Sequence, residues 1–324
     1  MSGSQEFDGL EGSSKERSIM TVAVSSRALF SLEEENELFK AKGQVAFDEH
    51  MLQNAAKVLK PGVAFPVVRR LLGLNSPGRK DRVTVIVLSR NSPAAGLRVM
   101  QSINALGLDI QKAVFTSGAE RFRYAEAMGA HLFLSANEAD VQSAAGYGIA
   151  AAAVVPMELS DDGGEALRVA FDGDSTVLGS SSDEVFRLHG LAKFREHETL
   201  HADVPIEDGP FRPVLERMVR LRASLGERSE LIRLALVTAR GVSSPRAMKT
   251  LMSWGLNLDE SVFADGEDKG AVLKAFGAHI YFDDTKRHVD SAVRHLVPAG
   301  RVLSGVTDIA APVLQTGQNC AANG

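Results

Sequence analysis

The sequence is poor in cysteine and has no long apolar run. Cys320 is the one cysteine among 324 residues, so no disulfide can form within the chain, and a reducing compartment is favoured. The longest apolar stretch, residues 149–157, is far too short to span a bilayer. Residues 1–18 are polar and do not resemble a secretory signal. We therefore expect a cytoplasmic protein with no membrane partner.

The sequence also lacks an excess of positive charge. Its 36 Lys and Arg residues face 41 Asp and Glu residues, for a net charge of −5. No basic surface of the kind that binds nucleic acid is therefore expected. The densest basic stretch is interpreted as a solvated helix end and loop, and it contains Arg69, Arg70, Arg79, Lys80 and Arg82.

A third absence is the sequence Gly-x-Gly-x-x-Gly, which follows neither of the candidate first strands. This argues against a nicotinamide-dependent oxidoreductase. With 44% hydrophobic residues, the chain can nevertheless bury substantial cores, and its length fits about two domains.

What the sequence does contain is an internal repeat. Three residues recur 147 positions later in the same order: Gly43, Phe47 and His50 match Gly190, Phe194 and His197. Farther along, Gly-Ala-His-Leu-Phe at 129–133 matches Gly-Ala-His-Ile-Tyr at 277–281. An ordered series of matches indicates a duplication, with copies over residues 20–157 and 166–305.

Each copy reads as strands that alternate with helices, which predicts an α/β fold with parallel sheets and helices on both faces. The strands are expected at 21–29, 83–88, 113–115, 131–134 and 150–155, and at 167–171, 232–237, 261–263, 279–282 and 301–303. A helical insertion follows the first strand of each copy, at 34–74 and 183–225, where it would cover the carboxyl edge of the sheet. The acidic, glycine-containing stretch 158–165 fits a boundary between the copies, and residues 1–19 and 306–324 are expected to be disordered tails.

The apolar run 167–171 ends in two aspartates one residue apart, Asp172 and Asp174. Side chains of an extended chain alternate between its two sides, so both carboxylates should face one site at the sheet edge where ligands bind. A hard divalent cation such as Mg2+ would offset their mutual repulsion. The alternative is a strand-end turn in which the aspartates cap the next helix.

Further polar residues follow other strands of the same copy. Thr238 follows the run 232–237, and its hydroxyl could hydrogen-bond a phosphate oxygen. Lys269 lies where a helix should begin and would bring a positive charge to an anion there. Asp283 and Asp284 follow the run 279–282 and add carboxylates for a cation. Each residue alone could equally be a cap or a solvated side chain, but the combination is specific.

The first copy lacks these carboxylates. In order, the residues aligned with Asp172, Asp174, Thr238, Lys269, Asp283 and Asp284 are Ser31, Glu33, Ser89, Arg121, Ser135 and Ala136. Scaffold residues persist in both copies while the candidate site residues differ. We therefore expect one active site, in the second copy.

The residues singled out resemble the four motifs of haloacid-dehalogenase-like (HAD-like) phosphohydrolases: Phe171-Asp172-Gly173-Asp174, Val237-Thr238-Ala239-Arg240, Lys269 and Phe282-Asp283-Asp284. More narrowly, segments 24–30, 148–152 and 253–256 are similar to the cytosolic 5'-nucleotidase I family, over about residues 20–305. Ser175-Thr176 departs from the small apolar residue expected after the aspartates. The resemblance implies HAD-like Rossmannoid parallel sheets with helical cap insertions, the cap of the catalytic copy lying at about 180–228.

The resemblance also implies Mg2+-dependent hydrolysis of nucleoside 5'-monophosphates. Asp172 would be the nucleophile that forms an aspartyl-phosphate, and Asp174 the general acid and base. Mg2+ would be held by Asp172, the backbone carbonyl of Asp174, and Asp283 supported by Asp284. The substrate phosphate would be bound by Thr238, Ala239, Arg240 and Lys269.

The nucleoside partner is less well defined by the sequence. Candidates for recognising the base are Phe186, Phe194, His197 and Arg240. A structural role is favoured for His197, because it recurs as His50, and Trp254 is expected in the core. Two alternatives stay open: a HAD-like phosphatase for another small phosphate ester, and a non-catalytic nucleotide-binding protein. A homo-oligomer is also left open.

Overall fold

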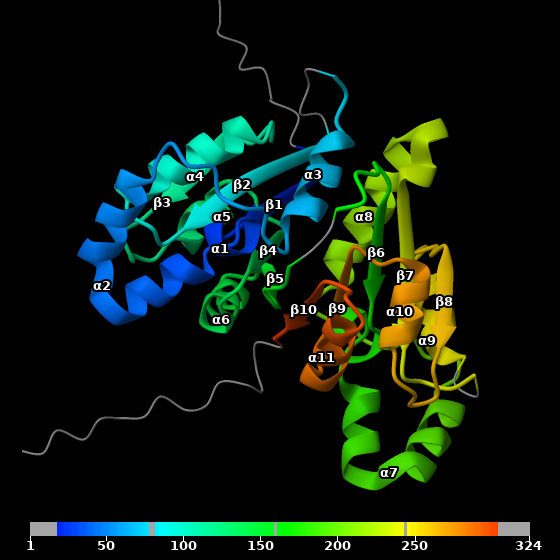
Figure 1. The fold of residues 1–324 in the computed structure, drawn as a ribbon. Coiled ribbons are helices and arrows are strands. Elements are labelled where there is room, and N and C mark those ends of the chain that lie inside the picture. The colour runs from blue at the N-terminus through cyan, green and yellow to red at the C-terminus, as the bar shows by residue number, and fades with distance from the viewer. Residues whose placement is uncertain (1–17, 78–81, 159–160, 243–244, 304–324) are drawn as a thin grey trace, which may run out of the picture.

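The structure is a computed structural model that describes residues 18–77, 82–158, 161–242 and 245–303 (Figure 1). The expected tails, except for Ser18 and Ile19, and Cys320 lie outside the described residues. Within the described ranges, no helix is long and apolar enough to cross a membrane.

The first half of the chain alternates strands and helices, as its hydrophobic pattern predicts. Its elements are β1 (Met20–Val24), α1 (Ser26–Leu29), α2 (Glu33–Gln53), α3 (Phe65–Gly73), β2 (Val83–Ser89), α4 (Pro93–Ala105), β3 (Lys112–Phe115), α5 (Phe122–Ala127), β4 (Leu132–Ser135), α6 (Glu138–Gly146) and β5 (Ala150–Val154).

The second half follows the same course, with two additional short helical segments. Its elements are β6 (Leu167–Phe171), the π-type turn η1 (Gly173–Val177), α7 (Ser181–Leu200), α8 (Arg212–Ser224), the 3-10 segment η2 (Gly226–Leu231), β7 (Ile232–Thr238), α9 (Arg246–Ser253), β8 (Glu260–Phe263), α10 (Gly270–Phe276), β9 (Ile280–Asp283), α11 (Lys286–Arg294) and β10 (Ala299–Val302).

The strands form one ten-stranded sheet with the order β3-β2-β1-β4-β5-β10-β9-β6-β7-β8. Read outward from the central pair β5 and β10, each half shows the same order of strands. Among the named strands of the described chain, β5 and β10 form the one antiparallel pair, in which Gly300 faces Val154. The α/β prediction is confirmed, but the two halves share one sheet, because the last strand of each half pairs with the other instead of forming an edge.

The predicted first strand, 21–29, is too long. The strand ends at Val24, and Ser25 begins helix α1, because its side chain accepts a hydrogen bond of 3.2 Å from the backbone N–H of Ala28. A serine that satisfies a free N–H in the first turn is a favoured helix cap. The chain therefore turns away from the sheet at Ser25.

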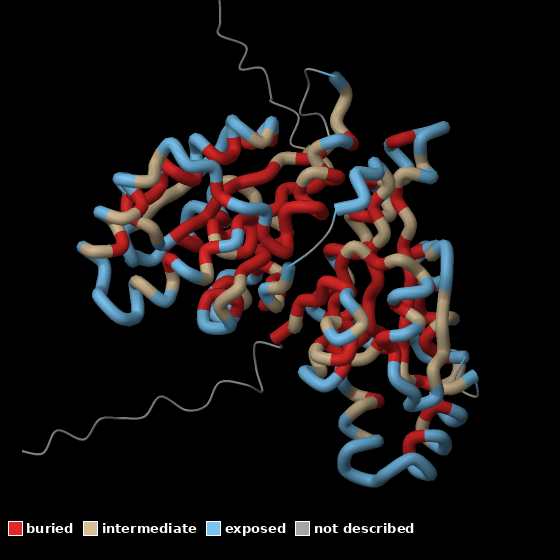
Figure 2. The backbone as a smooth tube through the Cα atoms, viewed as in Figure 1, coloured by how far each residue is buried: buried red, intermediate tan, exposed pale blue. Residues whose placement is uncertain are grey.

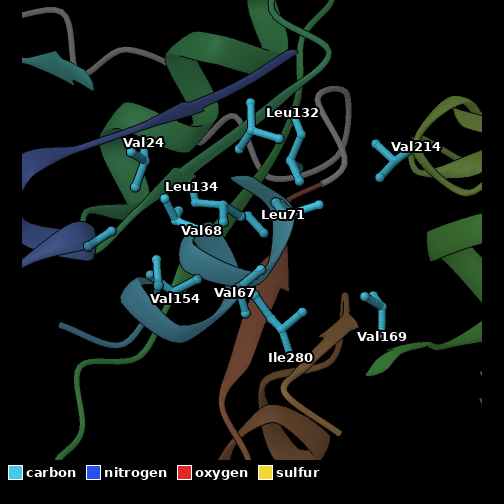
Figure 3. Packing of buried hydrophobic residues seen from close by; sticks show 14 of the residues in the cluster. Val24, Val67, Val68, Leu71, Leu132, Leu134, Val154, Val169, Val214 and Ile280 are labelled. Atoms are coloured by element: carbon cyan, nitrogen blue, oxygen red, sulfur yellow. The ribbon is translucent and has the colours of Figure 1, made fainter. Parts of the chain in front are cut away.

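Buried side chains of both halves meet in one core cluster, since it contains residues of α3, β1, β6 and β9. Figure 3 shows Val67, Val68 and Leu71 of α3 between the two halves, near Ile280 of β9. Each such aliphatic side chain contributes about 1.5–3 kcal/mol when it is fully removed from water. The helix α3 thus holds the two halves of the sheet together.

The repeated Gly-Ala-His segments have the same role in both halves. The backbone N–H of Thr21 donates to Nδ1 of His131 at 2.9 Å, and that of Arg168 donates to Nδ1 of His279 at 3.0 Å. Each histidine thereby joins the start of one central strand to its neighbour.

The basic stretch at 69–82 is not simply solvated, as the sequence suggested. Arg70 is buried and pairs with Asp161 at 2.8 Å and with Asp162, while Arg69 pairs with Asp161 at 2.9 Å. The acidic segment between the halves therefore neutralises the end of α3. Arg79 and Lys80 lie outside the described residues.

Two kinked helices, α2 and α7, extend beyond the carboxyl edges of their half-sheets (Figure 1), and Figure 2 shows α7 as mostly exposed. Each kinks at a glycine with φ of 77°, Gly43 or Gly190, a left-handed conformation that side chains disfavour. This accounts for the recurrence of that glycine in the sequence.

Candidate active site

Asp172 occupies the first position after β6. Its backbone N–H donates to the carbonyl oxygen of Phe282 on β9 at 2.8 Å, which continues the hydrogen bonding of the parallel sheet by one residue. The carboxylate is therefore fixed at the carboxyl edge, and only 5% of the residue is exposed. Burial, with the negative charge of Asp283 nearby, raises the pKa of Asp172 well above its ordinary value.

Lys269 bridges two of the predicted carboxylates. Its Nζ donates to Oδ1 of Asp172 at 2.6 Å, to Oδ2 of Asp283 at 3.0 Å and to the hydroxyl of Tyr281 at 3.0 Å. Burial alone would lower the pKa of this amine, but the charges of Asp172 and Asp283 outweigh it and raise the pKa. The residue is a buried cation held in place at the start of α10.

Three carboxylates converge at this position. Side-chain oxygens of Asp172, Asp283 and Asp284 all lie within 4.8 Å of one another, which suits a hard cation with oxygen ligands. Burial and the charge of Asp283 raise the pKa of Asp284 to about 7, as expected for acids crowded without enough positive charge. The donor set and its electrostatics therefore fit Mg2+, although the side chain of Asp174 is not part of the cluster.

Asp283 is the best-satisfied acid of the group. Its Oδ1 accepts from the N–H of Thr285 at 2.7 Å, its Oδ2 accepts from Tyr281, and Nδ1 of His288 lies 3.1 Å from Oδ2. Burial acts to raise the pKa of Asp283, yet the hydrogen bond to His288 and the charge of Lys269 hold it below the ordinary value. Of the three clustered aspartates, Asp283 is thus the one whose ionised form is best stabilised.

Asp174 lies in an ion pair with Arg240. The guanidinium donates through Nε at 2.9 Å and through a terminal nitrogen at 2.6 Å. The same guanidinium also binds Glu198 of α7 and lies 5.3 Å from the ring centre of Phe194. Arg240 therefore joins the turn after β6 to the overhanging helix.

Thr238 and Gly173 lie in contact at the tip of β7. The hydroxyl of Thr238 accepts from the backbone N–H of Arg240 at 3.2 Å, and a Cβ built on Gly173 would lie 3.3 Å from that hydroxyl oxygen. A larger residue at 173 would crowd the threonine. Close packing against Thr238 therefore explains why glycine stands between the two aspartates.

These residues border a cavity of about 300 Å3, here called the active-site cavity. Asp172, Asp174 and Asp284 line one side, and helix α7 provides an apolar wall of Phe186, Leu191 and Phe194. The predicted site residues Asp172, Asp174, Ala239, Arg240 and Asp284 all line it. Thr238, Lys269 and Asp283 are not among the described residues that line it; Lys269 binds both Asp172, which does line it, and Asp283. Of the segment 180–228, only the α7 part reaches the cavity, whereas α8 packs against the core.

Comparison with known proteins decides the family. The sequence model of the 5'-nucleotidase family matches residues 12–309. The chain belongs to this family. It is also 33% identical over 296 residues to human cytosolic 5'-nucleotidase 1B. This match covers 86% of the chain and 48% of the relative, so the chain spans about half the length of that protein. No solved structure matches.

In this member of the 5'-nucleotidase family, one predicted candidate for base recognition, His197, lies apart from the cavity. The ring of His197 lies against that of His201, with centres 4.3 Å apart, and His197 is not among the described residues that line the cavity. Trp254 packs against the core beneath Arg212, as expected.

The sequence analysis missed several residues of the site. Glu198, buried in α7, accepts from Ser182 at 2.7 Å and from Arg246 at 3.1 Å besides binding Arg240. Tyr281 and His288 hold Asp283. Their proximity in the sequence to Asp283 was a usable signal. Glu198 offered none, because it lies in a helix that is polar along most of its length.

The first half has a matching edge, but the alignment of Ser31 and Glu33 with the two aspartates is wrong. Strand register pairs Val24 with Leu134 and Phe171 with Phe282, and the N–H of Ser25 donates to Leu134 as that of Asp172 donates to Phe282. Ser25 and Arg27 therefore take the places of Asp172 and Asp174. The sequence alignment had matched Phe30 with Phe171. Phe171 ends strand β6, whereas Phe30 follows helix α1, so the two residues are not equivalent.

Proposed function

We propose that the chain is a Mg2+-dependent 5'-nucleotidase that hydrolyses nucleoside 5'-monophosphates to nucleoside and phosphate. Membership of the 5'-nucleotidase family supports the phosphomonoester class. The observation that carries the proposal is the cluster of Asp172, Asp283 and Asp284 at the carboxyl edge, beside a cavity with an aromatic wall. Lys269 joins the first two of these acids. The human relative is cytosolic by name, which supports a cytoplasmic location.

The nucleophile in this proposal is the carboxylate of Asp172. One oxygen attacks phosphorus, a new oxygen–phosphorus bond forms, and the bond from phosphorus to the ribose O5' breaks. The result is an aspartyl-phosphate on Asp172. Lys269 keeps the carboxylate oriented and supplies positive charge beside the transferring phosphoryl group.

Asp174 gives its proton to the leaving ribose oxygen and later takes one from the water that attacks phosphorus, releasing phosphate and regenerating Asp172. The ion pair with Arg240 must loosen for this to happen, because the guanidinium occupies the carboxylate oxygens of Asp174. The incoming phosphate supplies the cause, because it competes for the same guanidinium. Arg240, Ala239 and Thr238 then receive the phosphate.

Bound Mg2+ would neutralise charge between the nucleophile and the phosphate. The side chains of Asp172, Asp283 and Asp284, together with the backbone carbonyl of Asp174, would hold the ion. The raised pKa of Asp284 fits this role, because the carboxyl group gains from a nearby cation.

The fold in this proposal is HAD-like and duplicated. Both halves share one strand order, the same histidine contacts and the same glycine kink, which supports descent from one ancestral unit. Only residues 166–305 retain the acids, with α7 as the cap, while residues 20–157 form a degenerate copy.

The experiment is phosphate release by the purified chain from a panel of nucleoside 5'-monophosphates, sugar phosphates and phosphoserine, each with Mg2+ and with EDTA. The proposal expects the highest kcat/KM for nucleotides and no turnover in EDTA. Preference for a sugar phosphate or phosphoserine would instead favour a HAD-like phosphatase for another small phosphate ester. Nucleotide binding without any phosphate release would identify a non-catalytic binder.

A further inference from the structure

The first half contains a cavity of about 280 Å3 at its own carboxyl edge, here called the first-half cavity. It is lined by strand-tip serines and by residues of α2, as the active-site cavity is by α7. The two edges lie on different sides of the molecule (Figure 1), since the half-sheets meet through the antiparallel β5–β10 pair. The cavity is therefore separate from the active site.

The residues of the first-half cavity carry the opposite charge balance. Arg27, Arg90 and Arg121 line it with one carboxylate, Asp140, whereas the active-site cavity is lined by five aspartates and three arginines. Of the three arginines in the first-half cavity, Arg27 also pairs with Glu33 at 2.6 Å. Asp140 is itself shared, lying 2.7 Å from Arg121 and 3.2 Å from Arg90. A cation has no reason to enter this cavity, but an anion does.

Three residues that line this cavity each have a buried nitrogen without a hydrogen-bond acceptor among the described residues: Nδ2 of Asn36, Nδ2 of Asn91 and Nε of Arg121. Arg121 is only 3% exposed. Buried donors without partners are costly, so a group of them lining one cavity indicates a ligand rich in acceptors. The described residues of the active-site cavity have no such unpaired atom.

Hydroxyl groups complete the lining. Ser26 and Ser89 lie 3.0 Å apart at adjacent strand tips, and the N–H of Asn91 donates to Ser89 at 3.1 Å, as that of Arg240 donates to Thr238. Arg121 and Asn91 thus occupy the places of Lys269 and Arg240. Ser25 and Ser135 stand in place of the nucleophile and of Asp283, so the cavity offers donors but neither a carboxylate nucleophile nor a cation cluster.

We propose that the first-half cavity binds a phosphate group, as the free ion or as part of a small phosphate ester, and does not hydrolyse it. Arg121 donates to the phosphate oxygens from the start of α5, Asn91 from the loop after β2, and Asn36 from α2. The donor inventory alone argues for this site, so it does not depend on the activity of the second half.

The test uses the full chain in EDTA, with inorganic phosphate as the probe in calorimetric titrations. Asn91→Asp keeps the size of the side chain but places a negative charge against the ligand. We expect it to weaken phosphate binding about tenfold or more, and Asn36→Asp to do the same. Asn104→Asp, which makes the same change on the exposed face of α4, should bind like the wild type. Thermal melts of every variant check that each is folded.

Lys269→Met separates this site from the active site. Phosphate binding in EDTA should survive that substitution even though turnover with Mg2+ is lost. Absence of phosphate binding in the wild type, binding as tight as the wild type by Asn91→Asp and Asn36→Asp, or loss of binding in folded Lys269→Met alone would each overturn the proposal. A chain without nucleotidase activity that still binds phosphate in the Asn91-dependent manner would refute the proposed function and leave this site standing.

Discussion

Nζ of Lys269 lies 2.6 Å from Oδ1 of Asp172, and both groups are removed from water. The pair joins the start of α10 to the end of β6, two segments 97 residues apart in the sequence. A buried cation of this kind stabilises the fold and orients the nucleophile at once, because its charge opposes the rise that burial and Asp283 give to the pKa of Asp172.

Lys269→Met should destabilise the protein strongly. Asp172 and Asp283 would lose their buried partner, and breaking such a pair costs about 3–5 kcal/mol of the free energy of unfolding, measurable by urea denaturation. Adding Asp172→Asn should recover part of that loss, since one unpaired charge is then removed. Lys274→Met, on the exposed side of α10, is the control. Equal stabilities for the two lysine variants would refute the role of the buried pair.

Glu198→Gln should loosen helix α7. The carboxylate holds Arg240 of the strand tip and Arg246 of α9, and its loss should cost about 3 kcal/mol and speed hydrogen exchange along α7. The KM for nucleotide should rise, because Arg240 is no longer held. Glu196→Gln removes an exposed ion pair from the same helix and should change stability by less than about 0.5 kcal/mol. Unchanged exchange in Glu198→Gln would contradict the account.

Phe186→Ala should impair recognition of the nucleoside. The ring lines the active-site cavity, is 48% exposed and packs edge-on against Phe194 with centres 6.1 Å apart. Stacking on a base is worth about 1–3 kcal/mol, so the KM for nucleotides should rise about tenfold while turnover of a small aliphatic phosphate is unchanged. Phe39→Ala changes the matching ring of the first half and should leave both values alone. A similar KM for nucleotides in both variants would exclude Phe186 as a base platform.

The fold should weaken in mild acid through His279. Burial, with Arg70 close by, lowers the pKa of this histidine from 6.5 to about 4. Between these values the unfolded chain binds a proton that the folded chain does not, so the contribution is complete above pH 6.5 and is lost as the pH falls toward 4. The loss should be about 1 kcal/mol after allowance for solvent screening of a half-buried ring.

Urea denaturation from pH 7 to pH 4 measures this effect. His279→Asn retains an acceptor for the N–H of Arg168 and should show a flatter decline. His189→Asn, an exposed histidine on α7, should follow the wild type. A slope that is the same in all three proteins would mean that His279 does not contribute.

The sequence predicted the strands of the second half within two residues, because each is a short apolar run bounded by polar residues. It also located the acids, since residues after parallel strands meet at one edge. The single ten-stranded sheet was not predictable in this way. Its formation depends on β5 meeting β10, and nothing in the local pattern of either strand records its partner.

Two other errors have separate causes, one local and one long-range. The first strand was extended to Leu29 because the apolar residues of α1 continue its pattern, although Ser25 is a good helix cap. Glu198 escaped notice because its partners Arg240 and Arg246 lie more than 40 residues away. Long-range charge pairing leaves no periodic signal along the chain.

The central claim is that Asp172 attacks the phosphate of a nucleotide in a Mg2+-dependent site. The most direct measurement is phosphate release from nucleoside 5'-monophosphates by wild type and Asp172→Asn, with Mg2+ and with EDTA, alongside the exposed control Asp203→Asn. We predict Mg2+-dependent turnover by wild type and control, and a loss of roughly 10^4-fold in folded Asp172→Asn. Appreciable turnover by that variant, or by the wild type in EDTA, would contradict the account.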